Sequence, residues 1–273
     1  MFRTIAISDP RFERDGLRHV TVKSPSLRGR ADVTVWVPPV GEPAGLVILL
    51  HGVYGSHWSW TMRAGAHRTA ARLVETGELP PVVLAMPSDG LRGDGSGYLR
   101  HGDGVDFEQW IVREVPLAVR EAVPSLAPDV PRFVAGLSMG GFGALRIGAR
   151  YASEFRGIAA HSAITHVSQM RQFVEEDPAA FGHPASDAAA LDAIVAAGDA
   201  LPPLRFDCGR DDQLIEENRE LHRALHARGI PHAYEEHPGG HEWPYWETHI
   251  EDTLRFFARC LGETGRRADP RMA

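Results

Sequence analysis

The pentapeptide Gly136-Leu137-Ser138-Met139-Gly140 joins a short apolar segment at residues 132–135 to a segment of helical spacing at residues 139–151. A turn this sharp between a strand and a helix strains the residue at its apex, and side chains two positions to either side would collide with the neighbouring elements. Glycine at both positions removes those collisions. We therefore predict that the turn presents Ser138 as a nucleophile at the carboxyl edge of a sheet. A helix-capping serine in a glycine-rich turn is the plainer alternative.

A second turn is predicted at the same edge of the sheet. The apolar run at residues 46–50 is typical of a strand that is buried on both faces, and it ends in His51-Gly52-Val53-Tyr54-Gly55. We expect the backbone amides of Val53 and Met139 to form an oxyanion hole, because both would point to where a carbonyl oxygen gains charge. The alternative is that the two glycines of this turn only end the strand.

An acid and a histidine follow the serine in the chain order of a serine, acid and histidine triad. Asp212 comes after a predicted strand at residues 204–208, and His241 comes after a predicted strand at residues 232–237. A hydroxyl is a poor nucleophile at neutral pH, so it needs an imidazole base that a carboxylate orients. Asp211 is an alternative triad acid, and Asp212 is alternatively only the N-cap of the next helix.

A metal site is the chemical alternative for the histidine. His237 and His241 are four residues apart, and His249 follows. Pro238-Gly239-Gly240 breaks any helix between the first two, so they cannot share a helix face as the histidines of a zinc motif do. We therefore predict that the site holds no metal and needs no cofactor.

Four motifs along the chain carry a resemblance to a known family. They are His51-Gly-Val-Tyr-Gly, Gly136-Leu-Ser-Met-Gly-Gly, Cys208-Gly-Arg-Asp-Asp-Gln-Leu and Pro238-Gly-Gly-His-Glu-Trp. Over residues 17–261 the chain resembles the putative-esterase branch of the α/β-hydrolases, which includes esterase D-like enzymes, tributyrin, feruloyl and acetylxylan esterases, and mycolyltransferases. The resemblance implies a triad of Ser138, Asp212 and His241, with Asp212 favoured over Asp211. The segment after His51 lacks the cysteine- and acid-bearing stretch of a formylglutathione hydrolase, which argues against that substrate.

Strands that alternate with helices predict an α/β fold, in which a mostly parallel central sheet has helices on both faces. Together with the resemblance, this pattern implies one α/β-hydrolase domain over residues 1–273, with a small cap at 164–200 and a frayed tail at 262–273. Residues 19–23 and 31–37 alternate as an antiparallel edge hairpin does. Further strands are predicted at 46–51, 82–87, 132–136, 156–161, 204–208 and 232–237, and helices at 59–76, 106–123, 139–151, 213–228 and 243–261.

Ligands of such sheets bind outside the carboxyl ends of the strands, so the loops there should shape the substrate site. The glycine-rich loop at residues 88–104 and the insertion at 164–200 are expected to cover it. These loops contain few apolar residues, which favours a substrate with a small acyl group. The aromatic residues expected at the pocket are Tyr54, Tyr98, Trp58 and Trp243.

Composition agrees with one catalytic domain. The 273 residues are 43% hydrophobic, enough for a large core, and the net charge of −7 argues against nucleic acid or an anionic membrane as a partner. No apolar run is long enough to span a membrane.

Cys208 and Cys260 are expected to be buried thiols, which favours a cytoplasmic location. The sequence also allows a homo-oligomer.

These observations predict a serine carboxylesterase that hydrolyses small-acyl carboxylic esters through an acyl-enzyme. An acyltransferase or a thioesterase of the S-formylglutathione hydrolase type would use the same triad. A hydrolase fold that serves only as a binding module is the alternative from another class. The presence of all three triad residues counts against it.

Overall fold

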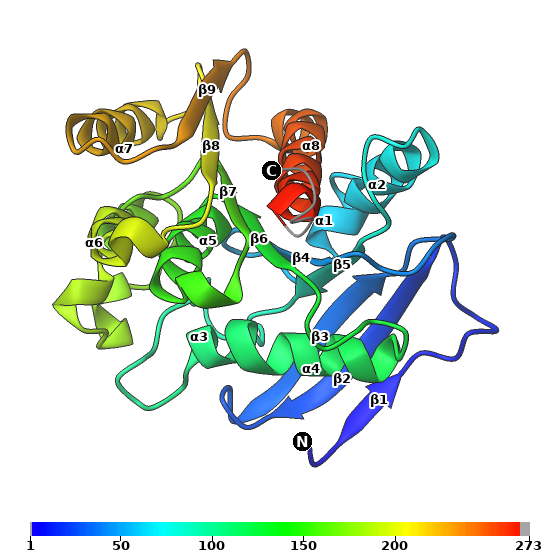
Figure 1. Ribbon diagram of the computed structural model, residues 1–273. Coiled ribbons are helices and arrows are strands. Elements are labelled where there is room, and N and C mark those ends of the chain that lie inside the picture. The colour runs from blue at the N-terminus through cyan, green and yellow to red at the C-terminus, as the bar shows by residue number, and fades with distance from the viewer. Residues whose placement is uncertain (1, 268–273) are drawn as a thin grey trace.

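The computed structural model describes residues 2–267 of the chain (Figure 1). Nine strands of this part form one sheet in the order β1-β2-β3-β5-β4-β6-β7-β8-β9. The strands are β1 (Ile5–Ile7), β2 (Leu17–Ser24), β3 (Gly29–Trp36), β4 (Leu46–Leu50), β5 (Val83–Pro87), β6 (Arg132–Leu137), β7 (Gly157–His161), β8 (Leu204–Gly209) and β9 (Ala233–His237).

The six strands from β5 to β9 in the sheet order are parallel, whereas β1, β2 and β3 add to the β5 edge in antiparallel pairs. This confirms the predicted hairpin and the mostly parallel sheet. The short edge strand β1 was not predicted, because three residues are too few to show alternation.

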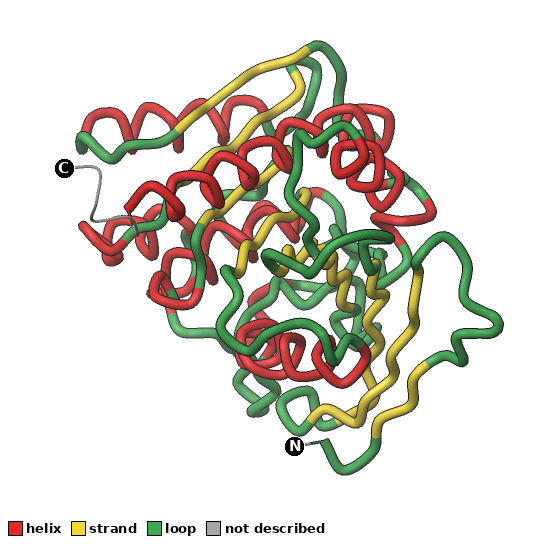
Figure 2. The backbone as a smooth tube through the Cα atoms, turned by 45° about the vertical axis from the view of Figure 1, so that its right-hand side comes forward, coloured by secondary structure: helices red, strands yellow, loops and turns green. Residues whose placement is uncertain are grey.

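Helices cover both faces of the sheet, which twists strongly from β1 to β9 (Figures 1 and 2). Val47 and Leu49 of β4 pack in a core with α1, α2 and α8, while Ile48 and Leu50 of the same strand pack in the core with α4 to α7. This alternation explains why β4 is apolar at all five positions. The helices are α1 (Ser59–Met62), α2 (Ala66–Glu75), α3 (Phe107–Gln109), α4 (Val115–Ala122), α5 (Met139–Arg150), α6 (Ala190–Ala197), α7 (Ile215–Ala227) and α8 (Trp243–Arg267).

Three predicted helices differ from the observed ones. The helix predicted over 59–76 is divided into α1 and α2, because Gly65 takes a left-handed φ of 57° between them. The helix predicted over 106–123 contains a π-helical segment, Trp110–Glu114, between α3 and α4. Helix α8 extends to Arg267, so the predicted frayed tail is wrong for residues 262–267, and its remainder lies outside the described residues.

The predicted cap segment is a series of short helices. Besides α6 it contains the 3-10 helices η3 (Val167–Gln172), η4 (Pro178–Phe181), η5 (Ala185–Asp187) and η6 (Gly198–Ala200). Helix α6 packs along α5 on one face of the sheet. Among residues 2–267, no helix combines the length and the apolar character that a bilayer span requires.

Candidate active site

The turn between β6 and α5 places Ser138 at the carboxyl edge of the sheet. Its backbone has φ 54° and ψ −120°, a strained conformation for a residue with a side chain. A Cβ atom on Gly136 would lie 2.2 Å from the carbonyl oxygen of Gly140, and one on Gly140 would lie 2.3 Å from that of Leu50. Both glycines are therefore required by the close approach of β6, α5 and β4.

A continuous hydrogen-bonded chain connects the serine, the histidine and one aspartate. Ser138 Oγ lies 3.0 Å from His241 Nε2, and His241 Nδ1 lies 3.1 Å and 3.0 Å from the two carboxylate oxygens of Asp212. Asp212 is almost fully buried, whereas Asp211 is exposed. The structure thus brings together the three predicted residues, and it places Asp212 rather than Asp211 beside the imidazole.

Asp212 is held as a carboxylate. Burial would raise its pKa, but hydrogen bonds from His241, from the Leu214 amide and from the Ser162 hydroxyl outweigh burial, so the pKa of Asp212 lies below its ordinary value. The Leu214 amide donates to Asp212 Oδ1 at 2.9 Å. The capping role considered from the sequence therefore accompanies the contact with His241, and the two do not exclude each other.

The two turns whose amides were predicted for the oxyanion hole approach each other, since a Cβ on Gly52 would lie 3.4 Å from Ser138 Cβ. Val53 follows β4 and Met139 is the first residue of α5, and within residues 2–267 neither amide donates to a protein acceptor. The loop at residues 88–104 covers this side, since the Gly97 amide contacts Met139 Sδ at 3.3 Å. A Cβ on Gly95 would lie 3.2 Å from Val53 Cγ1.

Comparison with known proteins identifies the family. A model of the putative esterase family matches residues 24–257. The chain belongs to this family. It is therefore a carboxylic ester hydrolase. An acetyl esterase of Caldicellulosiruptor saccharolyticus is 28% identical over 229 residues, which are 77% of this chain and 82% of that protein.

Solved structures show that this esterase has the α/β-hydrolase fold. A ferulic acid esterase is 24% identical with a TM-score of 0.74, and the match covers 94% of this chain and 98% of that one. FphF, a fluorophosphonate-binding serine hydrolase of Staphylococcus aureus, is 22% identical with a TM-score of 0.74, over 88% and 97% of the two chains.

The aromatic residues predicted for the pocket of the esterase differ in exposure. Tyr54 and Trp58 are 62% and 41% exposed on the segment that follows β4, and Trp243 is partly buried at the start of α8. Tyr98 is fully buried, and its hydroxyl accepts from the amide of His51 and donates to its carbonyl oxygen. The prediction that Tyr98 lines the pocket is therefore corrected, because its ring supports the turn after β4 from inside the core.

Phe173 is a candidate site residue that the sequence did not reveal. Its ring lies 4.9 Å from the His241 ring, and Trp246 approaches the same imidazole edge to face at 5.0 Å. Phe173 lies in the cap segment directly after η3, where no periodic pattern or motif marks it. Only the fold brings it to His241.

The three-histidine metal alternative is not assembled in the esterase. His241 contacts Ser138 and Asp212, while the rings of His237 and His249 stack at 4.1 Å with 15° between their planes. With Asp252, these two histidines place ligand atoms within 4.8 Å of one another. Two nearly parallel rings cannot both direct their in-plane lone pairs at one ion, so this arrangement is a poor metal site.

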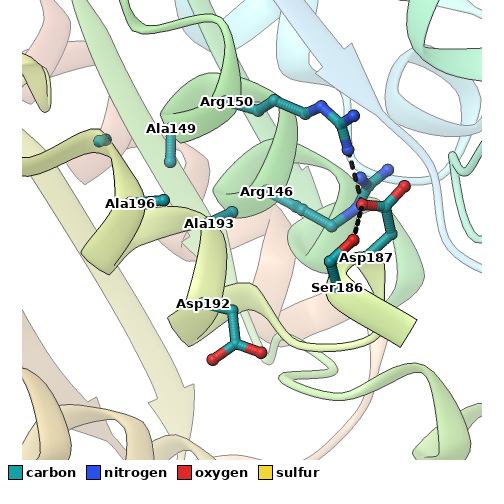
Figure 3. A pocket seen from close by; sticks show the side chains of 9 residues that line it. Arg146, Ala149, Arg150, Ser186, Asp187, Asp192, Ala193 and Ala196 are labelled. Carbon is teal, nitrogen blue, oxygen red and sulfur yellow. Dashed lines mark hydrogen bonds and ion pairs between the residues drawn. The ribbon is translucent and has the colours of Figure 1, made fainter. Parts of the chain in front are cut away.

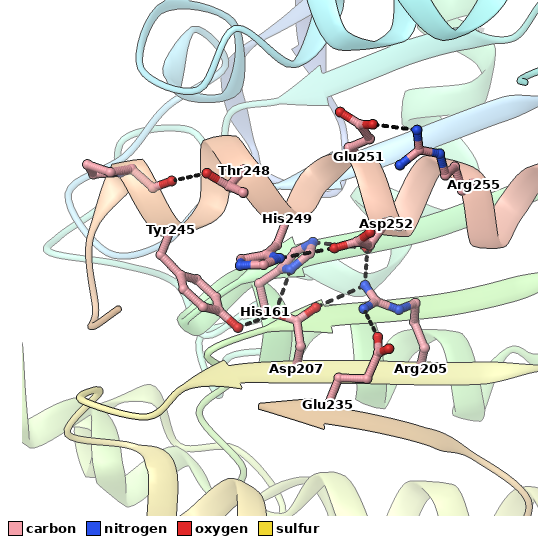
Figure 4. Close-up of polar contacts among 12 residues, drawn as sticks. His161, Arg205, Asp207, Glu235, Tyr245, Thr248, His249, Glu251, Asp252 and Arg255 are labelled. Carbon is pink, nitrogen blue, oxygen red and sulfur yellow. Dashed lines mark hydrogen bonds and ion pairs between the residues drawn. The ribbon is translucent and has the colours of Figure 1, made fainter. Parts of the chain in front are cut away.

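A buried charged network supports the sheet beneath the site. Figure 4 shows Asp207 between His161, Arg205 and Tyr245. Its carboxylate lies 3.0 Å from His161 Nδ1, 2.9 Å from Arg205 Nη1 and 2.9 Å from the Tyr245 hydroxyl. Burial would raise the pKa of Asp207, but these partners outweigh it and lower the pKa to about 2. The network therefore joins β7, β8 and α8.

A hollow of about 330 Å³ between α5 and α6 lies apart from this site (Figure 3). Its α5 wall is formed by Arg146, Ala149 and Arg150, at the far end of the helix from Ser138. Arg150 pairs with Asp187 across the hollow at 2.7 Å, so opposite charges already neutralise each other there.

Proposed function

We propose that Ser138, His241 and Asp212 hydrolyse small-acyl carboxylic esters through an acyl-enzyme. The observation that carries the proposal is the hydrogen-bonded chain from Asp212 through His241 to Ser138 Oγ, with contacts of 3.0 to 3.1 Å. This is the arrangement in which a base can take the proton of a serine hydroxyl as the hydroxyl attacks.

Each group has a defined role in the proposed reaction. Ser138 Oγ attacks the ester carbonyl while His241 Nε2 takes its proton, and the Val53 and Met139 amides donate to the resulting oxyanion. His241 then protonates the leaving alcohol, which departs and leaves the acyl group on Ser138. Water then attacks the acyl carbonyl while His241 takes its proton, and His241 returns that proton to Ser138 Oγ as the acid is released. Asp212 stabilises the imidazolium formed in both halves.

The preference for small acyl groups rests on the close packing around the oxyanion side. The loop at 88–104 lies directly against Val53 and Met139, and Phe173 stands against His241. The acetyl esterase relative supports the same class of substrate. Esters of a chromogenic phenol with acids of two to ten carbons test this preference. We expect kcat/KM to fall beyond four carbons, and a rise with length would overturn the acyl preference alone.

The proposed nucleophile is tested by covalent labelling. A fluorophosphonate should modify Ser138, and Ser138→Ala should lose both the label and at least 10³-fold in kcat, because the attacking oxygen is gone. Ser168→Ala is a matched control, since the exposed Ser168 Oγ also contacts a histidine, His166 Nδ1, at 2.7 Å. Label on Ser168, or activity of Ser138→Ala within tenfold of the wild type, would refute the proposal.

We further propose that the esterase acts in the cytoplasm, with a small-molecule ester rather than nucleic acid or a membrane as its partner. The net charge of −7 disfavours binding to anionic polymers and surfaces. Fractionation of the source cells, with activity followed in each fraction, tests the location. Recovery in the membrane or extracellular fraction would contradict it.

A further inference from the structure

Ser162 lies between the strand of the nucleophile and the strand of the acid. Strand β7 lies between β6 and β8 in the sheet and ends at His161. The His161 carbonyl oxygen accepts from the Ser138 amide at 3.0 Å, and the Ser162 amide donates to the Asp207 carbonyl oxygen at 2.8 Å. The end of β7 is therefore fixed on both sides next to the proposed triad.

The backbone of Ser162 is strained. Its φ is 46°, in the left-handed region that residues with a side chain seldom adopt, and the residue is fully buried. Glycine would take this conformation without strain. Strained residues persist where the surrounding structure holds them, and they cluster at functional sites, so the presence of a serine here calls for a role of its hydroxyl.

The Ser162 hydroxyl lies between an indole and the triad carboxylate. It accepts from Trp246 Nε1 at 3.2 Å, so its own proton remains to be donated. Ser162 directly follows β7 and Asp212 follows the neighbouring strand β8, and the hydroxyl of Ser162 contributes to the lowered pKa of that carboxylate. The Trp246 ring in turn stands at 89° to the ring of His241, 5.0 Å away. Trp246 thus links Ser162, on the strand next to that of the acid, to the imidazole of His241.

We propose that Ser162 and Trp246 are positioning residues of the esterase. The Trp246 indole orients the Ser162 hydroxyl toward Asp212, and its ring packs against the His241 imidazole and restrains it. The inference rests on the proposed roles of Asp212 and His241. A carboxylate fixed by one more hydrogen bond holds the imidazole in the orientation that the attack on the ester requires.

The first test separates this role from stability. Ser162→Gly removes the hydroxyl and also relieves the strained backbone, so the variant should melt no lower than the wild type. We expect kcat to fall about tenfold, the usual effect of one hydrogen bond to a charged group, while KM changes less than twofold. Trp246→Phe keeps a ring beside His241 and removes the indole donor, so it should lose about three- to fivefold in kcat.

Ser24→Ala is the matched control. Ser24 is also buried, and its hydroxyl donates to a carboxylate, Glu114 Oε2, at 2.5 Å. It lies on β2, away from the triad. We expect this variant to melt at a lower temperature and to keep its kcat. A merely structural role for Ser162 would give the same pattern as Ser24→Ala.

The second test asks whether Ser162 acts through Asp212. In an Asp212→Asn background, Ser162→Gly should lower kcat less than twofold, because the carboxylate that the Ser162 hydroxyl orients is already gone. A full tenfold loss there, or a loss under twofold in the wild-type background, would overturn the inference. If Asp212→Asn itself retained activity, the proposed triad would fail instead. If Ser162→Gly does not fold, the loss of kcat is compared in the two backgrounds with Ser162→Ala and Trp246→Phe instead.

Discussion

Gly140, in the active-site turn, has no room for a side chain. Its Cβ would lie 2.3 Å from the Leu50 carbonyl oxygen and 2.5 Å from that of His51, both of them backbone atoms. Strand β4 must therefore move if Gly140 is enlarged, and the turn that carries Val53 must move with it.

We expect Gly140→Ala to lower the free energy of unfolding by about 1–3 kcal/mol, as overpacking of a tight core does. The value of kcat/KM should fall more than 100-fold, because misplaced catalytic groups lose their alignment. Urea unfolding and ester hydrolysis measure the two effects. Gly262→Ala is the control, since nothing lies within 4 Å of a Cβ there. Equal behaviour of the two variants would contradict the role of the turn.

The two adjacent aspartates after β8 should differ sharply. Asp212→Asn should lose about 10³- to 10⁴-fold in kcat, because an amide in place of the carboxylate favours the wrong imidazole tautomer. Asp211 is exposed, and its amide bonds to the Gly239 carbonyl oxygen, so Asp211→Asn should lose less than fivefold. Steady-state kinetics of both variants measure the difference. The reverse order would move the acid to Asp211.

The sequence predicts some site residues and not others for a physical reason. Ser138 and Asp212 lie on short turns that directly follow apolar strands, so local pattern and spacing place them at one edge. Phe173 and Ser162 matter only through contacts with segments far away in the chain. The strained φ of Ser162 leaves no trace in the sequence, because no glycines flank this residue as they flank Ser138.

At the scale of elements, the covering loop and the cap segment are fastened to each other. The Asp94 carboxylate accepts from the amides of Glu175 and Glu176 at 2.8 Å and 3.1 Å, and the Glu176 carboxylate accepts from the Asp94 amide at 3.2 Å. Phe173 lies two residues before this pair of amides. The contact therefore fixes the segment that stands against His241.

We expect Asp94→Ala to raise KM about five- to tenfold with a smaller change in kcat, because freeing the segment disturbs the substrate pocket more than the triad. Hydrolysis of a short-chain ester over a range of concentrations measures both constants. Asp177→Ala is the control, since Asp177 pairs with Arg171 and caps η4 within the same segment. A KM that rises equally in both variants would argue against the contact.

The element pattern was predictable where periodicity is strong. The strands from β4 to β9 agree with their predictions within one or two residues, since short apolar or alternating runs end at glycines or polar turns. The prediction of one helix over 59–76 was wrong at Gly65. The left-handed conformation of this glycine divides the segment into two helices, although apolar residues recur at helical spacing on both sides. The 3-10 helices of the cap segment have no repeat long enough to detect.

At the scale of the whole molecule, the Asp207 network should make stability depend on pH. The pKa of Asp207 is about 2 in the fold, against 3.8 ordinarily. A carboxylate with a depressed pKa stabilises the fold above its unfolded pKa and loses this contribution as the pH falls toward 2. The contribution at neutral pH is on the order of 2 kcal/mol.

Urea unfolding at pH 6, 4 and 3 measures this dependence. The wild type should lose stability steeply below pH 4. Asp207→Asn should be less stable at pH 6, because Arg205 and His161 lose their partner, but its stability should fall less between pH 4 and pH 3. Parallel curves for the two proteins would show that Asp207 is not the group responsible.

Strand β9 is one of the two edge strands of the sheet, and within residues 2–267 it pairs with β8 alone. Its five residues are at best partly buried. His241, on the short loop that follows, depends on this weakly protected strand. Local opening of β9 should cost far less free energy than global unfolding, so its amides should exchange with deuterium before those of β6. On slow heating, the esterase should stop working several degrees before its core melts.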